Sequence, residues 1–285
     1  MGAQDIGISF GAPSEDAPLA GVRNVLCVAS GKGGVGKSTM TANLAAALGL
    51  DGKKVGVLDA DVYGYSMPRM LGIGGQPATP LGRRIVPLVS PSGVRVMSMG
   101  FFLSDRGRAV VWRGPMLHKA LNQFVAGVEW GQLDYLLIDL PPGTGDVSMT
   151  LAGLLPHARF IIVTTPQPAA QTVAARTADL AAQFELEVLG VVENMTTFTP
   201  PEGPLVAIFG TGGGAQLAEE LAVPLLASVP LDAALRISAD QGRPLVLGDQ
   251  ESPAARSIVE AARAITAASP RVCVPVDEPP CPEHP

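Results

Sequence analysis

The sequence predicts an α/β protein with a doubly wound, mostly parallel sheet and helices on both faces. Short β-rich runs alternate with longer Ala- and Leu-rich stretches from Asn24 onward, which is typical of parallel strands joined by crossover helices. Some runs, such as residues 55–58 and 135–138, are apolar throughout, as expected for strands covered on both faces. With 285 residues, 47% of them hydrophobic, the chain is long enough to bury one large core.

Each expected strand is a short β-rich run. In chain order these are residues 24–30, 54–59, 135–139, 159–165, 187–193 and 224–229. The expected helices have apolar residues at helical spacing and few internal breakers. They are residues 37–50, 167–184, 214–221 and 253–267. Residues 71–111 are rich in Gly, Pro and Arg, and their extended segments 84–89 and 94–99 predict an inserted hairpin.

We expect one folded domain, residues 23–267, between a flexible leader, residues 1–22, and a disordered tail, residues 268–285. The leader lacks the basic start and continuous apolar core of an export signal, which favours a cytoplasmic protein. Six of the last sixteen residues are Pro, a composition that favours disorder.

Composition excludes several classes of protein. The net charge is −6 and no Lys/Arg run occurs, so we expect binding to neither nucleic acid nor anionic membranes. The most apolar stretches, residues 135–140 and 160–165, are far shorter than the ~20 residues that cross a bilayer. Three cysteines do not make a disulfide framework, and Cys27 is expected inside a buried strand.

A phosphate-binding loop follows the first expected strand. Residues 31–39 read GKGGVGKST, which fits G-x-x-x-x-G-K-[ST] between a strand and a helix and makes the fold a P-loop NTPase. The glycines let backbone N–H groups surround phosphate oxygens. Lys37 is expected on the β- and γ-phosphates of ATP, Ser38 on Mg²⁺ and Thr39 on the α-phosphate. The expected nucleotide-binding residues are Gly31, Lys32, Gly33, Gly34, Val35, Gly36, Lys37, Ser38 and Thr39.

Carboxylates end two of the expected strands. Asp59 and Asp61 follow one strand, at the edge where open α/β sheets bind ligands. Asp139 follows four apolar residues and fits a Walker-B aspartate that binds Mg²⁺ through water. The following PPGTG predicts a switch loop that senses the γ-phosphate. Capping of the strand end is the alternative interpretation of Asp59 and Asp139.

A second lysine, Lys32, lies where the general pattern accepts any residue. GKGGVGKST resembles the deviant phosphate loop of the family that contains the nitrogenase iron protein, septum-site-determining ATPases and plasmid-partition ATPases. The resemblance implies that Lys32 reaches the partner's nucleotide in a homodimer and stabilises charge during hydrolysis. It also implies that Asp61 orients the attacking water and that Asp59 helps to hold the metal region. A solvated surface lysine is the alternative for Lys32.

The same resemblance places Asn194, which follows an expected strand, on the adenine edge, where an amide can both donate and accept. The segment VPLD, residues 229–232, is similar to the loop that flanks the base. An ordinary turn residue is the alternative for Asn194.

Further strings narrow the family. LDADVYGYSMPRMLG, VMSMGF, VWRGPM, DYLLIDLPPGTGD, IIVTTPQ, LGVVENM and IFGTGGG occur in the order and spacing of the Mrp-type (ApbC-like) iron–sulfur cluster carrier ATPases, from about Arg23 to Leu247. The resemblance implies a Mg²⁺-dependent homodimeric ATPase that binds a [4Fe–4S] cluster and transfers it to apoproteins. Trp112, Arg113 and Met116 in VWRGPM receive no role from the sequence.

One departure from the family stands out. Carriers of this type usually have a C-x-x-C pair between VVENM and IFG, whereas this chain has TTFTPPEGPLVA and no sulfur ligand there. Cys273 and Cys281, with His284 nearby, are alternative ligands; unused thiols are the other interpretation. Two further functions stay open: a nucleotide-gated positioning switch like the partition ATPases, and a cluster-free regulatory ATPase.

Overall fold

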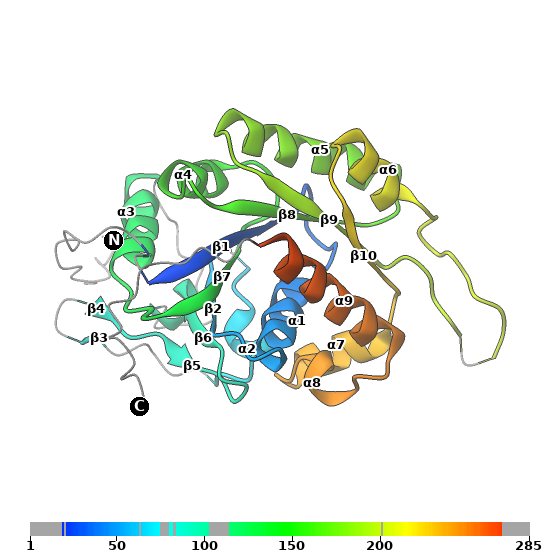
Figure 1. The fold of residues 1–285 in the computed structure, drawn as a ribbon, viewed down its shortest axis with the longest axis horizontal. Coiled ribbons are helices and arrows are strands. Elements are labelled where there is room, and N and C mark those ends of the chain that lie inside the picture. Colours follow the sequence, from blue (N-terminus) through cyan, green and yellow to red (C-terminus); the bar gives the residue numbers. More distant parts are fainter. Residues whose placement is uncertain are drawn as a thin grey trace, which may run out of the picture.

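The central element is an eight-stranded sheet with helices on both faces (Figure 1). The computed structural model describes residues 19, 21–62, 64–74, 80–81, 84–102, 114–200 and 202–269. The strand order is β10-β9-β8-β1-β7-β2-β6-β5, and every pairing is parallel except that of β5 with β6. The predicted α/β fold class is confirmed.

The strands of the main sheet match the apolar runs of the sequence. They are β1 (Val22–Ala29), β2 (Val55–Asp59), β5 (Leu88–Val89), β6 (Arg95–Ser98), β7 (Leu133–Asp139), β8 (Arg159–Thr164), β9 (Val188–Asn194) and β10 (Leu225–Val229). Two residues each of β3 (Pro80–Leu81) and β4 (Arg84–Ile85) form a separate ribbon. The second half of β1 and nearly all of β2 and β7 are buried, because helices cover both faces of the sheet there.

The helices form two layers. Figure 1 shows α4, α5 and α6 on one side of the sheet, and α1, α7, α8 and α9 on the other. Their bounds are α1 (Lys37–Leu50), α2 (Met67–Met70), α3 (Gly114–Ala126), α4 (Asp146–Leu154), α5 (Pro168–Gln183), α6 (Gly213–Glu220), α7 (Ala233–Asp240), α8 (Leu245–Gly248) and α9 (Pro253–Ala268), with a 3₁₀ turn, η1, at Met99–Phe102. Within the described part of the chain, each helix is too short or too polar to traverse a bilayer.

The predicted hairpin is present, but its strands are shorter than expected and belong to the main sheet. β5 and β6 do form a hairpin around Gly93, but β6 pairs in parallel with β2 and so extends the main sheet. Val96, Met97 and Ser98 are buried, which explains why this strand belongs to the core. The expected strand 84–89 is divided between two sheets, because Pro87 has no N–H to continue a ladder.

The sheet places a binding edge at the carboxyl end of β1. The chain runs from β1 toward β7 and β2 on one side, and its later strands β8, β9 and β10 lie on the other side. Such a reversal of strand order opens a crevice at the carboxyl edge, the usual ligand position in open α/β folds. The predicted leader and tail lie almost wholly outside the described residues.

Candidate functional site

The phosphate loop joins β1 to α1 at this crevice. Gly34 and Gly36 have φ values of 83° and 86°, in the left-handed region that favours glycine. Gly36 is also the N-cap of α1, and no side chain caps this helix. A Cβ atom at Gly36 would lie 2.2 Å from Nδ2 of Asn194, so only glycine fits. The loop therefore presents backbone amides and a helix N-terminus suited to an anion.

A buried carboxylate lies behind the loop. The Nζ atom of Lys37 lies 2.7 Å from Oδ1 of Asp139, which ends β7. Thr41, one turn further along α1, donates to the same oxygen at 2.9 Å. Ser38 donates to Oδ2 of Asp139 at 2.6 Å. Thus the predicted phosphate-binding lysine and the two predicted magnesium ligands, Ser38 and Asp139, come together in one hydrogen-bonded group.

Asp59 lies beside Asp139 in the register of β2 and β7, and its side chain is fully buried. Its Oδ2 accepts hydrogen bonds from Ser66 N at 3.0 Å and Met67 N at 3.1 Å, so it holds the start of α2. Ser98 of β6 donates to the same oxygen at 3.1 Å. Burial, followed by the negative charge of Asp139, raises the pKa of Asp59 to about 7, against the lowering effect of these hydrogen bonds and Lys37.

Asp61 forms the turn that follows β2. Its Oδ1 accepts a hydrogen bond from Gly64 N at 3.0 Å, and its own N–H donates to Oδ1 of Asp59 at 3.3 Å. The carboxylate is half-buried, in contrast to Asp59. It is therefore the more accessible of the two acids at this strand end, which suits the role predicted for it.

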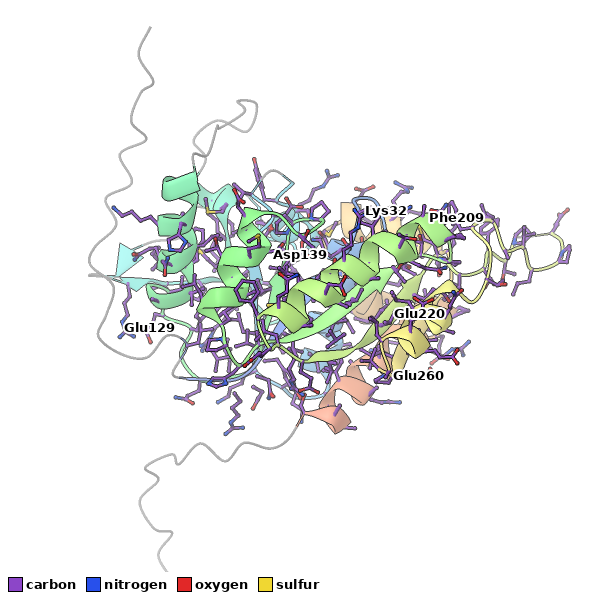
Figure 2. The ribbon with its side chains drawn as sticks, turned by 90° about the horizontal axis from the view of Figure 1, so that it is seen from above. Lys32, Glu129, Asp139, Phe209, Glu220 and Glu260 are labelled. Carbon is purple, nitrogen blue, oxygen red and sulfur yellow. The ribbon has the colours of Figure 1, made fainter. Side chains whose placement is uncertain are left out.

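Lys32 lies at the start of the loop, against α5. Its Nζ atom donates to Oε1 of Gln167 at 2.9 Å. The loop and α5 are closely packed, because a Cβ atom on Gly31 would lie 2.3 Å from the backbone of Val173. Within the described residues Lys32 forms no ion pair with an acidic side chain. Its ammonium thus binds a neutral amide at the edge of the loop, and Figure 2 labels the position of Lys32.

Asn194 ends β9 and contacts the loop directly. Its Nδ2 donates to the carbonyl oxygen of Val35 at 2.9 Å. The next residue, Met195, has φ of 60°, an uncommon conformation for a non-glycine residue. Thr196 N donates to Val229 O at 3.1 Å, so the predicted base-flanking segment, residues 229–232, runs beside the end of β9. The two predicted parts of the adenine site are adjacent.

The predicted switch loop is attached to the phosphate loop through its backbone. Gly143, with φ of 84°, donates its N–H to Ser30 O at 2.8 Å. Ser148, in the first turn of α4, donates to Gly143 O at 3.2 Å. Two hydrogen bonds through Gly143 thus join the end of β1, where the phosphate loop begins, to the first turn of α4.

The described residues do not fit an iron–sulfur cluster. Cys27 is the one described cysteine; it is buried in β1, and burial raises the pKa of its thiol to about 12. In the described ranges no three His, Cys, Asp or Glu residues gather as metal ligands. Trp112, Arg113, Cys273, Cys281 and His284 lie outside the described residues, and of Met116 only its backbone in α3 is described.

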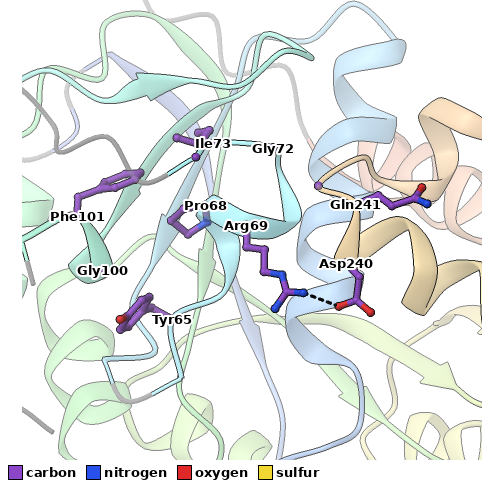
Figure 3. Close-up of a pocket in the computed structure, with 11 residues that line it drawn as sticks. Tyr65, Pro68, Arg69, Gly72, Ile73, Gly100, Phe101, Asp240 and Gln241 are labelled. Carbon is purple, nitrogen blue, oxygen red and sulfur yellow. Dashed lines mark hydrogen bonds and ion pairs between the residues drawn. The ribbon is translucent and has the colours of Figure 1, made fainter. Parts of the chain in front are cut away.

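A separate cavity of about 480 Å³ lies between α2 and the end of α7 (Figure 3). Its apolar wall contains Tyr65, Ile73 and Phe101, and Arg69 pairs with Asp240 at 3.2 Å on its rim. No residue of the phosphate loop lines it. It lies near the Asp59–Asp61 turn and is separate from the phosphate loop.

Four residues that form hydrogen bonds with the predicted site residues were not predicted from the sequence: Thr41, Ser66, Ser98 and Gln167. Thr41 could have been found, because it lies four residues after Lys37 on the same helix face. The contacts of the other three depend on how distant segments meet, which no local spacing gives.

Comparison with known proteins identifies relatives. A family model described as "ParA: NUBPL iron-transfer P-loop NTPase" matches residues 21–266. The chain is 48% identical over 244 residues to the "Iron-sulfur cluster carrier protein" of Mycobacterium leprae, covering 84% of this chain and 63% of that protein. It is 47% identical over 268 residues to the protein of the same name from Deinococcus radiodurans, covering 93% and 76%. The chain thus spans about three fifths of the length of its mycobacterial relatives.

Solved structures agree on the fold. A nucleotide-binding protein from Archaeoglobus fulgidus in complex with ADP has a TM-score of 0.72 and 36% identity, covering 83% of this chain and 92% of that chain. The cell division ATPase MinD from Pyrococcus furiosus has a TM-score of 0.65 and 26% identity, covering 86% and 99%. Both the sequence match and the structural match extend over most of the described residues.

Proposed function

Because the chain belongs to the NUBPL iron-transfer family of P-loop NTPases, we propose that it is a Mg²⁺-dependent ATPase that works as a homodimer and delivers iron–sulfur clusters to apoproteins. One observation supports the proposed ATPase activity most strongly. The uncapped start of α1 and its glycine loop lie directly in front of the buried group Lys37–Asp139–Ser38. These are the residue types that bind nucleoside triphosphate and magnesium.

Binding of ATP uses the loop amides and Lys37. The ammonium exchanges the carboxylate of Asp139 for the β- and γ-phosphate oxygens, which carry more negative charge. Ser38 and Asp139 would then hold Mg²⁺, whose bound charge neutralises the phosphates. Asp59, the third predicted residue of the metal region, keeps the start of α2 in place behind them.

Hydrolysis needs an oriented water and compensation of developing charge. Asp61 is the accessible acid beside the site, and we assign it the positioning of water. Lys32 is assigned to the nucleotide of a second copy, for which it must first leave Gln167. Asn194 is assigned to the adenine through the polar atom that does not contact Val35.

In this proposal the iron–sulfur cluster is the group that the protein carries, and no suitable cluster ligands are found among the described residues. Cys27 is unsuitable as a cluster ligand because its thiol is buried and its pKa is raised. The other two cysteines of the sequence are Cys273 and Cys281. A cluster-free regulatory ATPase is therefore a second candidate, favoured by the burial of Cys27.

Anaerobic purification and reconstitution decide between these candidates. Iron, sulfide and MgATP turnover are measured for the full chain and for a chain truncated after Ala268. The proposal predicts turnover in both chains, bound cluster in the full chain and transfer of that cluster to an apoprotein. Turnover without iron or sulfide in either chain would support the regulatory ATPase instead. Absence of turnover in the full chain would refute both.

A further inference from the structure

The cavity between α2 and the end of α7 has the size of a small-molecule site. Its volume of about 480 Å³ lies within the range of about 300–1,000 Å³ that ligand pockets have. Ile73 and Phe101 in its wall are each only 8% exposed, so this wall is packed against the rest of the protein. Figure 3 shows Tyr65 and Phe101 on one side of the cavity and the ion pair of Arg69 and Asp240 on the other. The cavity thus has an apolar part and a charged part.

Two glycines join the helices that border this space. Gly72 and Gly242 have φ values of 72° and 70°, in the left-handed region that favours glycine. A Cβ atom on Gly72 would lie 2.7 Å from the carbonyl oxygen of Gly242, and one on Gly242 would lie 2.8 Å from that of Arg69. The ends of α2 and α7 therefore meet through backbone atoms, and this contact fixes the distance between two walls of the cavity.

The charged part of the cavity has an excess of positive charge. A guanidinium nitrogen of Arg69 lies 3.2 Å from one carboxylate oxygen of Asp240, and one of Arg236 lies 2.8 Å from the other. Two guanidinium groups thus share one carboxylate, although the chain as a whole has a net charge of −6. Each guanidinium has five N–H donors, so Arg69 can bind a further anion while it stays paired. This end of the cavity is therefore complementary to an anionic group.

The apolar wall is connected to the acids at the end of β2. Tyr65 lies within residues 64–67, whose backbone N–H groups donate two hydrogen bonds to Asp59 and one to Asp61. A movement of the Tyr65 side chain therefore acts on the short segment that holds both carboxylates in place.

A second part of the wall reaches the same acid. The hydroxyl of Ser98 donates to Asp59 and accepts a hydrogen bond from the N–H of Gly100, each at 3.1 Å. A Cβ atom on Gly100 would lie 2.4 Å from the ring of Tyr65, so this ring packs directly on the backbone beside Phe101. A molecule bound between Tyr65 and Phe101 would therefore press on two segments that are both hydrogen-bonded to Asp59.

We propose that this cavity binds a small organic anion with a planar apolar body, and that binding there changes the rate of ATP hydrolysis. The apolar body lies against Tyr65 and Phe101, and the anionic group lies at Arg69. The occupant is a small molecule, because a single cationic group and an apolar wall of this size match one compact ligand. The effect on hydrolysis rests on the proposed function, whereas the binding site does not.

The test uses 2-naphthoate, a planar aromatic carboxylate, and its uncharged counterpart 2-naphthamide. Equilibrium dialysis against the full chain gives the dissociation constant of each. We expect saturable binding of naphthoate and a dissociation constant at least about tenfold higher for the amide, because the amide lacks the charge that Arg69 binds. Arg69→Gln should weaken naphthoate binding to a similar extent. Arg256→Gln is the matched control, since Arg256 is also exposed and ion-paired, with Glu251 at 3.7 Å on α9.

Turnover of MgATP is measured beside binding, with and without saturating naphthoate. The proposal predicts a changed turnover in the wild type and in Arg256→Gln, and none in Arg69→Gln at the same naphthoate concentration. Unchanged MgADP affinity and an unchanged melting temperature show that Arg69→Gln is folded.

The remaining outcomes separate the parts of the proposal. Absence of saturable binding, or equal naphthoate affinity in the wild type and Arg69→Gln, overturns the site. Saturable binding that leaves turnover unchanged overturns the link to Asp59. A wild-type chain without any turnover overturns the proposed function, while dialysis still decides the binding site. Tighter naphthoate binding by a chain truncated after Ala268 would overturn the small molecule as occupant and assign the cavity to the C-terminal segment.

Discussion

The ammonium of Lys37 lies 2.7 Å from a carboxylate oxygen of Asp139, and both side chains are buried at the carboxyl edge of the sheet. One residue begins α1 and the other ends β7. Breaking a buried ion pair by removing one partner leaves an uncompensated charge. The pair therefore links the stability of the nucleotide-free protein to the residues assigned to nucleotide binding.

Substitution Lys37→Ala tests this link. It removes the proposed phosphate ligand and leaves Asp139 without its cation, so we expect loss of measurable MgADP binding and a fall of about 3 kcal/mol in the free energy of unfolding. Calorimetric titration and urea denaturation measure the two effects. Lys53→Ala is the control, since the ammonium of Lys53 forms a long ion pair with the exposed Asp51 at 3.8 Å. Full nucleotide affinity in Lys37→Ala would refute the assigned role.

Substitution Asn194→Ala removes the donor to the buried carbonyl of Val35. An unsatisfied carbonyl costs about 1–3 kcal/mol, and here it belongs to the phosphate loop. We expect weaker ADP binding and a smaller preference for ADP over GDP, because the same amide is assigned to adenine. Binding of both nucleotides is measured by titration. Unaltered affinity and unaltered base preference would assign Asn194 to the turn alone.

Gln167 holds Lys32 within its own chain. Gln167→Glu converts a neutral hydrogen bond into an ion pair, so the lysine is released less readily. We expect unchanged MgADP affinity and a turnover several-fold below that of the wild type, partly restored by higher salt. Gln167→Ala serves as the comparison, with turnover at or above the wild-type value. Equal turnover in both variants would show that this contact does not restrain Lys32.

Asp59 makes stability depend on pH. Its pKa is about 7 in the folded chain and 3.8 in an ordinary environment, so the folded state binds the proton more tightly. The free energy of unfolding contributed by this group therefore falls as pH rises from about 4 to about 7. Asp59→Asn should flatten this dependence in urea denaturation from pH 5 to 8. Exposed Asp51→Asn is the control, and an unchanged slope in Asp59→Asn would contradict the assignment.

The sequence could predict elements whose signals are local. α1 begins and ends as predicted, because the GKST motif fixes its start and Asp51–Gly52 its end. The six strands expected from apolar runs are all present. The helices α3, α4 and α7 were not predicted; α4 and α7 have nine and eight residues, too short for a clear period. The extended segment 94–99 was predicted and is β6, but its pairing with β2 was not predicted, because that pairing depends on tertiary packing.

The candidate site likewise has parts that local sequence signals predict and parts that they do not. The glycine loop and the strand ends can be located in the sequence, and both lie at the carboxyl edge of a parallel sheet. Lys37, Ser38 and Asp139 were therefore expected together, as the structure has them. The contacts of Lys32 with Gln167 and of Asn194 with Val35 join residues 135 and 159 positions apart. Predicting them requires the strand order, which places β8 beside β1 and β9 beside β8 and is not encoded in any one motif.

Turnover of MgATP by Lys32→Ala, measured beside its affinity for MgADP, tests the central claim most directly. The account assigns Lys32 to charge stabilisation in a second copy, so affinity should match the wild type while turnover falls by at least about 100-fold. Turnover equal to the wild type in the presence of normal affinity would contradict the account.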